Sequence, residues 1–175
     1  MGADRRPFFL PASHDVTTPS RPYKVPESVL VVIHTPALEV LLIERADQPG
    51  FWQSVTGSKD TAGEPLLETC IREVAEETGI EVGSSEVPRT ALRDWQLANV
   101  YEIYPVWRHR YAPGVTHNTE HVFGLTVPRD IAIRLAPREH LRHEWLPYRE
   151  AADRCFSPSN AEAVLQLPRL WQGGA

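Results

Sequence analysis

Three closely spaced glutamates, Glu73, Glu76 and Glu77, are the side chains of this sequence best suited to chemistry. If residues 65–78 form an α-helix, its rotation of about 100° per residue gathers the three carboxylates on one face. Like charges four residues apart destabilise an isolated helix by a few tenths of a kcal/mol. We therefore expect a positively charged partner at this face. The apolar face lies roughly 120° away and consists of Leu67, Cys70, Ile71, Val74 and Thr78.

Convergent carboxylates of this kind are suited to binding a divalent metal ion. Mg²⁺ takes oxygen ligands and commonly completes its shell with water and substrate phosphates. Such an ion neutralises phosphate charge and activates a water molecule for attack on phosphorus. The alternative is an ordinary solvated acidic face, partly neutralised by Arg72. Helix geometry alone leaves both interpretations open.

The helix that must position these glutamates has recognisable ends. Pro65 stands at a first-turn position, where its missing N–H is not needed, and Gly79 can adopt the left-handed conformation that closes a helix. A second helix is predicted over residues 148–155. A third is predicted to begin at Ser157, whose hydroxyl can cap it, and to end or kink at Pro168.

Short runs rich in β-branched residues and leucine predict the strands of a sheet. The first two, 28–34 and 38–44, are separated by a turn sequence and are predicted to form a hairpin. Alternating strands and helices predict the α/β (α+β) class. We expect one domain over residues 22–172, after a Pro-rich tail over residues 1–21. The other predicted strands cover residues 53–56, 95–104, 121–127 and 131–135.

The composition limits the classes of partner. The 175 residues include 18 Lys and Arg against 23 Asp and Glu, a formal net charge of −5. This balance argues against a stable nucleic-acid partner or a membrane surface, both of which attract basic proteins. Residues 57–80 hold six acidic and two basic side chains, or −4 of that charge. A bound cation would turn this acidic segment into a site for a polyphosphate.

The cysteines and the hydropathy pattern bear on location. Cys70 and Cys155 lack the spacing of a metal site or a disulfide framework. No run of about 18 apolar residues marks a membrane span. We expect a cytoplasmic protein, and the sequence leaves its oligomeric state open.

The segment from Gly57 to Ile80 resembles the signature of the Nudix hydrolases. That signature is Gly, five residues, Glu, seven residues, and then Arg-Glu-apolar-x-Glu-Glu-x-Gly-apolar. The match from Glu64 to Ile80 is complete, whereas six residues rather than five separate Gly57 from Glu64. The resemblance implies an α/β/α sandwich with a mixed sheet between helices. It also implies a pyrophosphohydrolase that depends on Mg²⁺, with Mn²⁺ as the alternative ion.

The resemblance assigns roles to individual side chains. Glu73 and Glu77 correspond to the principal metal ligands. Glu76 and Glu77 correspond to the carboxylates that serve catalysis, with Glu76 as a further ligand or as the group that activates water. Glu64 and Arg72 correspond to a structural pair, because an Arg eight residues after a Glu can reach back over two helical turns.

Sequences outside the signature resemble one branch of the Nudix family more specifically. Residues 51–57, 108–120 and 139–146 are similar to those of family members that hydrolyse dihydroneopterin triphosphate in bacterial folate synthesis. This narrower resemblance implies a small-molecule pterin or nucleoside triphosphate as substrate, and makes Glu139 a further metal-binding and catalytic carboxylate. The substrate-binding residues that it implies are Lys24, Arg45, Thr56, Tyr101, Glu102, Ile103, Tyr104 and Ser157.

Several of these assignments have ordinary structural alternatives. Lys24 could be a solvated charge at the start of a strand, and Arg45 could pair with a neighbouring acid, Glu44 or Asp47. Residues 101–104 could simply alternate between core and surface. On its own, Glu139 would be interpreted as a surface acid.

Two further patterns carry little weight. His117 and His121, with Glu120 between them, have the H-x-x-E-H order of a zinc peptidase class, but they lie on a predicted loop and strand rather than the helix this chemistry requires. The basic run 108–110 is too short to indicate RNA binding. The remaining alternatives are another Nudix specificity, for deoxynucleoside triphosphates or RNA 5′ ends, and a non-catalytic Nudix-like ligand sensor.

Overall fold

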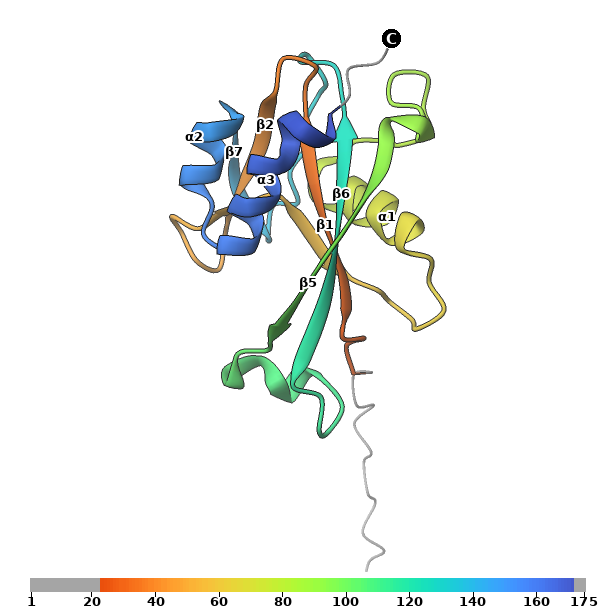
Figure 1. The fold of residues 1–175 in the computed structure, drawn as a ribbon, viewed down its shortest axis with the longest axis vertical. Helices are drawn as coiled ribbons and strands as arrows, with labels where there is room; N and C mark the ends of the chain where they lie inside the picture. The colour runs from red at the N-terminus through yellow and green to blue at the C-terminus, as the bar shows by residue number, and fades with distance from the viewer. Residues whose placement is uncertain (1–22, 172–175) are drawn as a thin grey trace, which may run out of the picture.

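The computed structural model describes residues 23–171, so the tail predicted over residues 1–21 lies outside the described residues. A seven-stranded mixed sheet forms the centre (Figure 1). Its strands are β1 (Glu27–His34), β2 (Glu39–Arg45), β3 (Trp52–Gln53), β4 (Val55–Ser58), β5 (Leu92–Glu102), β6 (His117–Thr126) and β7 (His140–Pro147). The helices are α1 (Leu66–Thr78), α2 (Tyr148–Arg154) and α3 (Pro158–Leu170), with short 3-10 turns at Arg89–Ala91 and Pro105–Arg110.

The strand β1 runs through the middle of the sheet and is buried on both faces. It pairs in parallel with β6, and β6 pairs antiparallel with β5. Along its other edge β1 meets two strands in turn. It pairs with β4 over Ser28–Val31 and with β2 only at His34. The sheet therefore divides along this edge, because β2 continues away from β1 to pair with β3 and β7.

Helices cover both faces of the sheet (Figure 1). Val29 and Val31 of β1 pack with Val74 of α1 in one buried cluster. Leu30 of β1, whose side chain points to the opposite face, packs with Val164 of α3 in the other. These two clusters make three layers, and the expected α/β/α sandwich is confirmed.

The predicted helix ends are confirmed in two places. Gly79 closes α1 in the left-handed conformation, with φ of 71°, and its N–H donates to Ala75. The Ser157 hydroxyl accepts a hydrogen bond from the Asn160 N–H and caps α3. At the other end, α3 continues past Pro168 to Leu170, so Pro168 does not end the helix.

The strand predicted over residues 131–135 is wrong. Ile131, Ile133 and Leu135 alternate inward against the core beside α1, which produced the strand-like pattern. The backbone here pairs with a helix end instead of a strand, because the Arg134 N–H donates to the carbonyl of Thr78. The strand missing from the prediction is β7, which pairs along the length of β2.

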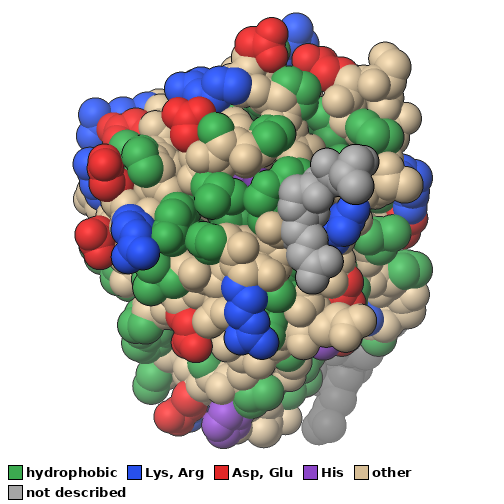
Figure 2. Space-filling model, turned by 45° about the horizontal axis from the view of Figure 1, so that its top comes forward, with side chains coloured by type: hydrophobic (Ala, Val, Ile, Leu, Met, Phe, Trp, Pro, Cys, Tyr) green, Lys and Arg blue, Asp and Glu red, His purple; other side chains and the backbone are tan. Residues whose placement is uncertain are grey.

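The surface carries intermixed charges. On the face that Figure 2 presents, Lys and Arg side chains stand among Asp and Glu side chains around an apolar centre. Among residues 23–171, no helix is both long enough and apolar enough to cross a membrane.

Candidate active site

Helix α1 directs Glu73 and Glu77, one turn apart, toward the sheet. Glu73 lies against Gly57 in β4 so closely that a Cβ atom at Gly57 would stand 1.8 Å from the Glu73 Cδ atom. This contact gives a physical reason for glycine at the start of the signature. Glu77 is almost fully buried, whereas the Glu76 side chain is 59% exposed. The three glutamates thus share a helix face but differ in their surroundings.

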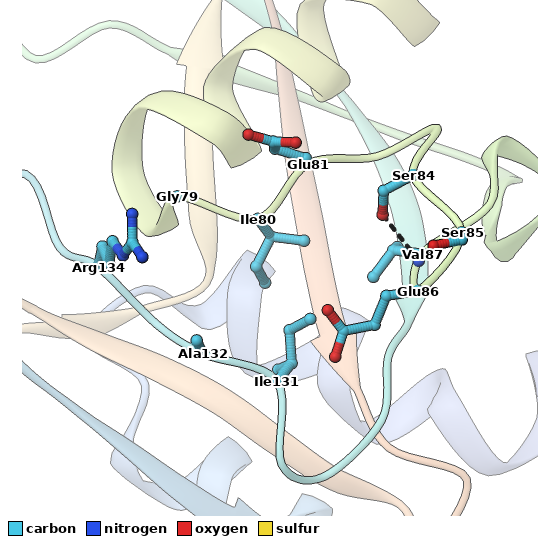
Figure 3. Close-up of a pocket in the computed structure, with 10 residues that line it drawn as sticks. All are labelled: Gly79, Ile80, Glu81, Ser84, Ser85, Glu86, Val87, Ile131, Ala132 and Arg134. Carbon is cyan, nitrogen blue, oxygen red and sulfur yellow. Dashed lines mark hydrogen bonds between the residues drawn. The ribbon is translucent and has the colours of Figure 1, made fainter.

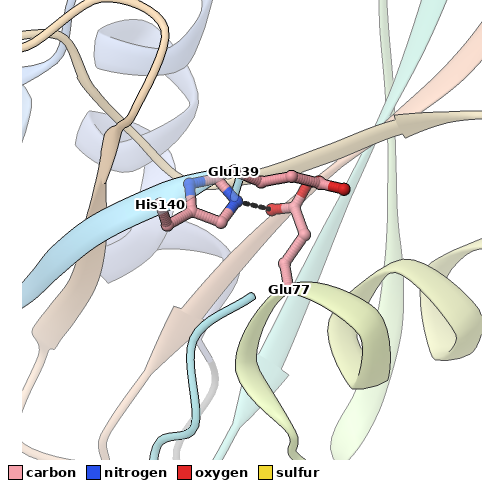
Figure 4. A group of neighbouring side chains, drawn as sticks. All are labelled: Glu77, Glu139 and His140. Carbon is pink, nitrogen blue, oxygen red and sulfur yellow. Dashed lines mark ion pairs between the residues drawn. The ribbon is translucent and has the colours of Figure 1, made fainter. Parts of the chain in front are cut away.

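Glu77 belongs to a cluster with the first residues of β7. One ligand atom each from Glu77, Glu139 and His140 lies within 4.8 Å of the others (Figure 4). The His140 Nε2 atom is 3.3 Å from the Glu77 Oε2 atom. Neither of these atoms, nor His140 Nδ1, has a hydrogen-bond partner within residues 23–171. Since buried polar atoms are normally satisfied, a cation held by the carboxylates fits this cluster.

The pKa values of both inward glutamates are raised. Burial raises the pKa of Glu73 to about 7, against the lowering effect of Arg72, and the charges of Glu77 and Glu76 add to the rise. Burial likewise raises the pKa of Glu77, although His140 opposes the shift. Desolvation penalises the ionised carboxylates here. A divalent cation would restore their ionised form, so the electrostatics also fit a metal site.

Arg72 joins the signature loop to α1. Its Nε atom donates to Glu64 Oε1 at 3.0 Å, and its other nitrogens reach Glu73 Oε1 at 2.8 Å and the Ser58 carbonyl at 3.0 Å. The Glu64 carboxylate also accepts the Asp60 N–H at 2.6 Å, and Arg72 keeps the pKa of Glu64 below its ordinary value. The pairing expected between Glu64 and Arg72 is confirmed.

The extra residue in the loop is accommodated on the surface. Residues 60–63 are exposed, and a Cβ atom at Gly63 would meet no other atom within 4 Å. A turn hydrogen bond from the Glu64 N–H to the Thr61 carbonyl closes the loop at 3.1 Å. Gly57 keeps its contact with Glu73, so the insertion bulges outward and leaves the glutamates in place.

Two of the expected substrate residues, Arg45 and Thr56, are linked through the side chain of Gln53. Arg45 contacts Gln53 Oε1 at 3.4 Å, and Gln53 Nε2 donates to the Thr56 hydroxyl at 3.3 Å. Arg45 also makes a two-point ion pair with Asp47, at 2.8 and 2.6 Å, so the structural alternative for Arg45 is present as well. Lys24 is exposed, and its N–H donates to the Arg110 carbonyl at 2.8 Å.

The run Tyr101–Tyr104 is divided between different environments. Tyr101 accepts a hydrogen bond from Asn118 at 3.1 Å, and Glu102 forms an ion pair with Arg108. Ile103 is buried, which fits core packing rather than ligand contact, whereas Tyr104 is exposed. The structure therefore brings Tyr101 to the sheet face covered by α3 and leaves the rest of the run near the exposed end of β5.

His140 is a candidate that sequence reasoning missed. Its only signal in the sequence is its position next to Glu139, and its approach to Glu77 depends on β7, which was not predicted.

A separate concavity lies away from these carboxylates. It has a volume of about 250 Å³ and adjoins the end of α1, between Gly79, Val87 and Ile131 (Figure 3). It contains none of the expected site residues, so we do not assign it to the active site.

Comparison with known proteins defines the class. Residues 24–167 match the NUDIX domain, and the chain belongs to the Nudix family. It is 43% identical over 146 residues to the dihydroneopterin triphosphate diphosphatase of Escherichia coli (strain K12), covering 83% of this chain and 93% of the relative. The protein of the same name from Haemophilus influenzae is 39% identical over 143 residues, which are 81% of this chain and 87% of that one.

A solved structure agrees with this relationship. The E. coli dihydroneopterin triphosphate pyrophosphohydrolase superposes with a TM-score of 0.73 at 43% sequence identity. The alignment covers 83% of this chain and 97% of that structure.

Proposed function

We propose that this protein is a metal-dependent diphosphatase that hydrolyses dihydroneopterin triphosphate to dihydroneopterin monophosphate and pyrophosphate. The observation that carries the proposal is the cluster of Glu77, Glu139 and His140, in which the buried Glu77 Oε2 atom has no hydrogen-bond partner among the described residues and is available to a cation. The relatives that share 39–43% identity bear the name of this activity. A pterin triphosphate is the small-molecule partner we infer, in the cytoplasm, and the specific ion we infer is Mg²⁺, with Mn²⁺ as the alternative.

The metal would be held by Glu73, Glu77 and Glu139. When bound, it neutralises phosphate charge and polarises the attacking water. Arg72 orients Glu73 through their 2.8 Å contact and through its bonds to the preceding loop. The His140 imidazole, at 3.3 Å, faces the buried Glu77 oxygen and limits its movement. These contacts preorganise the carboxylates before the substrate arrives.

Glu76 and Arg45 act on the water and the substrate. Glu76 is the most exposed carboxylate on this face of α1 and can accept the proton that water loses as it attacks phosphorus. The new bond joins the water oxygen to phosphorus, and the bond to the leaving phosphate oxygen breaks. Arg45 can exchange its ion pair with exposed Asp47 for charge-assisted hydrogen bonds to phosphate oxygens.

The test is release of pyrophosphate from dihydroneopterin triphosphate, with Mg²⁺ or with EDTA. We expect wild-type turnover with the metal, and a loss of several orders of magnitude in the Glu77→Gln variant, which keeps the side-chain shape. The Glu150→Gln variant, at an exposed position in α2, is the matched control. Full activity of Glu77→Gln would refute the metal assignment.

A substrate panel tests the choice of pterin. Comparing kcat/KM for dihydroneopterin triphosphate, dATP and triphosphorylated RNA separates the Nudix specificities considered above. A preference of about a hundredfold for dATP or RNA, equivalent to about 3 kcal/mol, would overturn the pterin assignment. Absence of pyrophosphate release from every substrate would favour a ligand sensor.

A further inference from the structure

A group of polar side chains lies on the sheet face that α3 covers, outside the cluster of metal-binding candidates. In β6, Asn118 and Glu120 point to the same face as Val122, which packs in the cluster with α3. In the neighbouring strand β5, Tyr101 pairs with Asn118 and Asn99 pairs with Glu120. The polar side chains therefore stand together where an apolar layer would be expected.

Glu120 is buried without a strong partner. It is only 6% exposed, and its Oε2 atom lies 3.4 Å from the Ser159 hydroxyl, the long end of the hydrogen-bond range. Burial raises the pKa of Glu120 above its ordinary value, although Ser159 and Asn99 oppose the shift. A carboxyl group in such a position costs folding free energy unless a ligand or partner compensates it.

Asn118 supplies an unsatisfied acceptor next to Glu120 on β6. It is 2% exposed, and its amide nitrogen donates to the Ser28 hydroxyl at 2.7 Å and to the Tyr101 hydroxyl at 3.1 Å. Its Oδ1 atom has no hydrogen-bond partner among the described residues. Strand β6 therefore carries two buried acceptors, the Glu120 carboxyl group with one long hydrogen bond from Ser159 and the unpaired Asn118 Oδ1 atom.

A cavity lies beside several neighbours of Glu120, although neither Glu120 nor Asn118 is part of its lining. It has a volume of about 280 Å³ between the sheet and α3, and its lining includes Asn99, Val122 and Ser159, which are all neighbours of Glu120. The Ser159 hydroxyl is also 3.3 Å from that of Ser157. Glu120 is thus connected through Ser159 to Ser157. Asn118 is connected to Tyr101 by strand pairing and by a hydrogen bond. Ser157 and Tyr101 are both residues already expected to bind substrate.

We propose that Glu120, assisted by Asn118, recognises the substrate's heterocycle by accepting hydrogen bonds from its 2-amino-4-oxopyrimidine edge. This inference rests on the proposed function, which supplies the pterin. That edge presents a ring N–H beside an exocyclic amino group, a pair of parallel donors that the two oxygens of one carboxylate can accept. Asn118 Oδ1 accepts a further N–H. A heterocycle without the donor pair leaves the buried carboxyl unpaired and is rejected.

The first arm of the test changes the ligand. Fluorescence titration compares pterin with lumazine, in which an oxo group replaces the 2-amino group, on the wild-type protein. We expect pterin to bind at least tenfold more tightly. Equal affinity for the two would overturn the proposal, and this arm does not depend on how any variant folds.

The second arm changes the protein. Glu120→Gln keeps the shape but turns one acceptor into a donor. We expect the pterin preference to disappear and KM for dihydroneopterin triphosphate to rise at least tenfold, with kcat changed less than threefold. Glu77→Gln should lose hydrolysis and keep the pterin preference, and Glu150→Gln should change neither.

The outcomes separate this inference from the proposed function. Unchanged KM and pterin binding in Glu120→Gln, with wild-type hydrolysis intact, would overturn the role of Glu120 alone. A wild-type protein that prefers pterin to lumazine but releases no pyrophosphate would refute the proposed reaction and still support the pterin subsite.

Discussion

Replacing Glu73 with Gln should make the metal-free protein more stable at neutral and alkaline pH while it abolishes most of the activity. The Glu73 carboxyl is 13% exposed, and its pKa is raised by burial to about 7. In the folded protein it therefore stays protonated over a range in which the unfolded chain is already ionised. Glutamine keeps the shape, and its carbonyl oxygen can still accept the hydrogen bond from Arg72.

The magnitude follows from the difference in pKa. The pKa of Glu73 rises from its ordinary value of 4.5 to about 7, so ionising this carboxyl group costs the folded state about 3 kcal/mol. The folded-state pKa is the higher one, so the unfolded state loses its proton first and this cost grows as pH rises. It is absent below about pH 4.5, increases between there and about pH 7, and is complete above that.

The assay is urea unfolding in EDTA at pH values from 4 to 8, for wild type and Glu73→Gln. The advantage of the variant should approach 3 kcal/mol at the upper end and vanish at the lower end. The Glu76→Gln variant is the matched control, because its exposed side chain should alter stability by no more than about 0.5 kcal/mol. Saturating Mg²⁺ should stabilise wild type more than Glu73→Gln, since binding stabilises the folded state. A Glu73→Gln variant less stable than wild type in EDTA at pH 8 would refute the reasoning.

Three further substitutions probe other contacts. Gly57→Ala places a Cβ atom 1.8 Å from Glu73 Cδ and should lower kcat/KM at least tenfold by displacing that carboxylate. Far-UV circular dichroism checks that the variant folds. Wild-type kinetics in the variant would contradict the close contact. His140→Ala should raise the Mg²⁺ concentration for half-maximal activity severalfold, and an unchanged metal titration would show that His140 does not position Glu77. Arg45→Ala should raise KM for the triphosphate at least tenfold. It should change the unfolding free energy by under about 1 kcal/mol, because the ion pair of Arg45 with Asp47 is at the surface. An unchanged KM would show that Arg45 only pairs with Asp47 and does not bind the substrate.

The sequence predicted the parts of this protein that depend on local chain geometry. The helix of the signature, its closing glycine and the Ser157 cap all follow from spacing and backbone preference within a few residues. The same local reasoning failed at residues 131–135, where alternating burial arises from packing beside α1 and not from strand pairing. It also missed β7, whose many polar residues lie on a strand that only its pairing with β2 defines.

For the site, the spacing of Glu73, Glu76 and Glu77 was enough to predict that they share one helix face, because the helical repeat dictates it. Which of these carboxylates are buried depends on how α1 packs against the sheet, since Glu73 packs on Gly57 while Glu76 remains in solvent. The same holds for the approach of His140 to Glu77 and for the burial of Glu120. Each is a contact between distant segments, which the sheet register and the packing of helices on its two faces create.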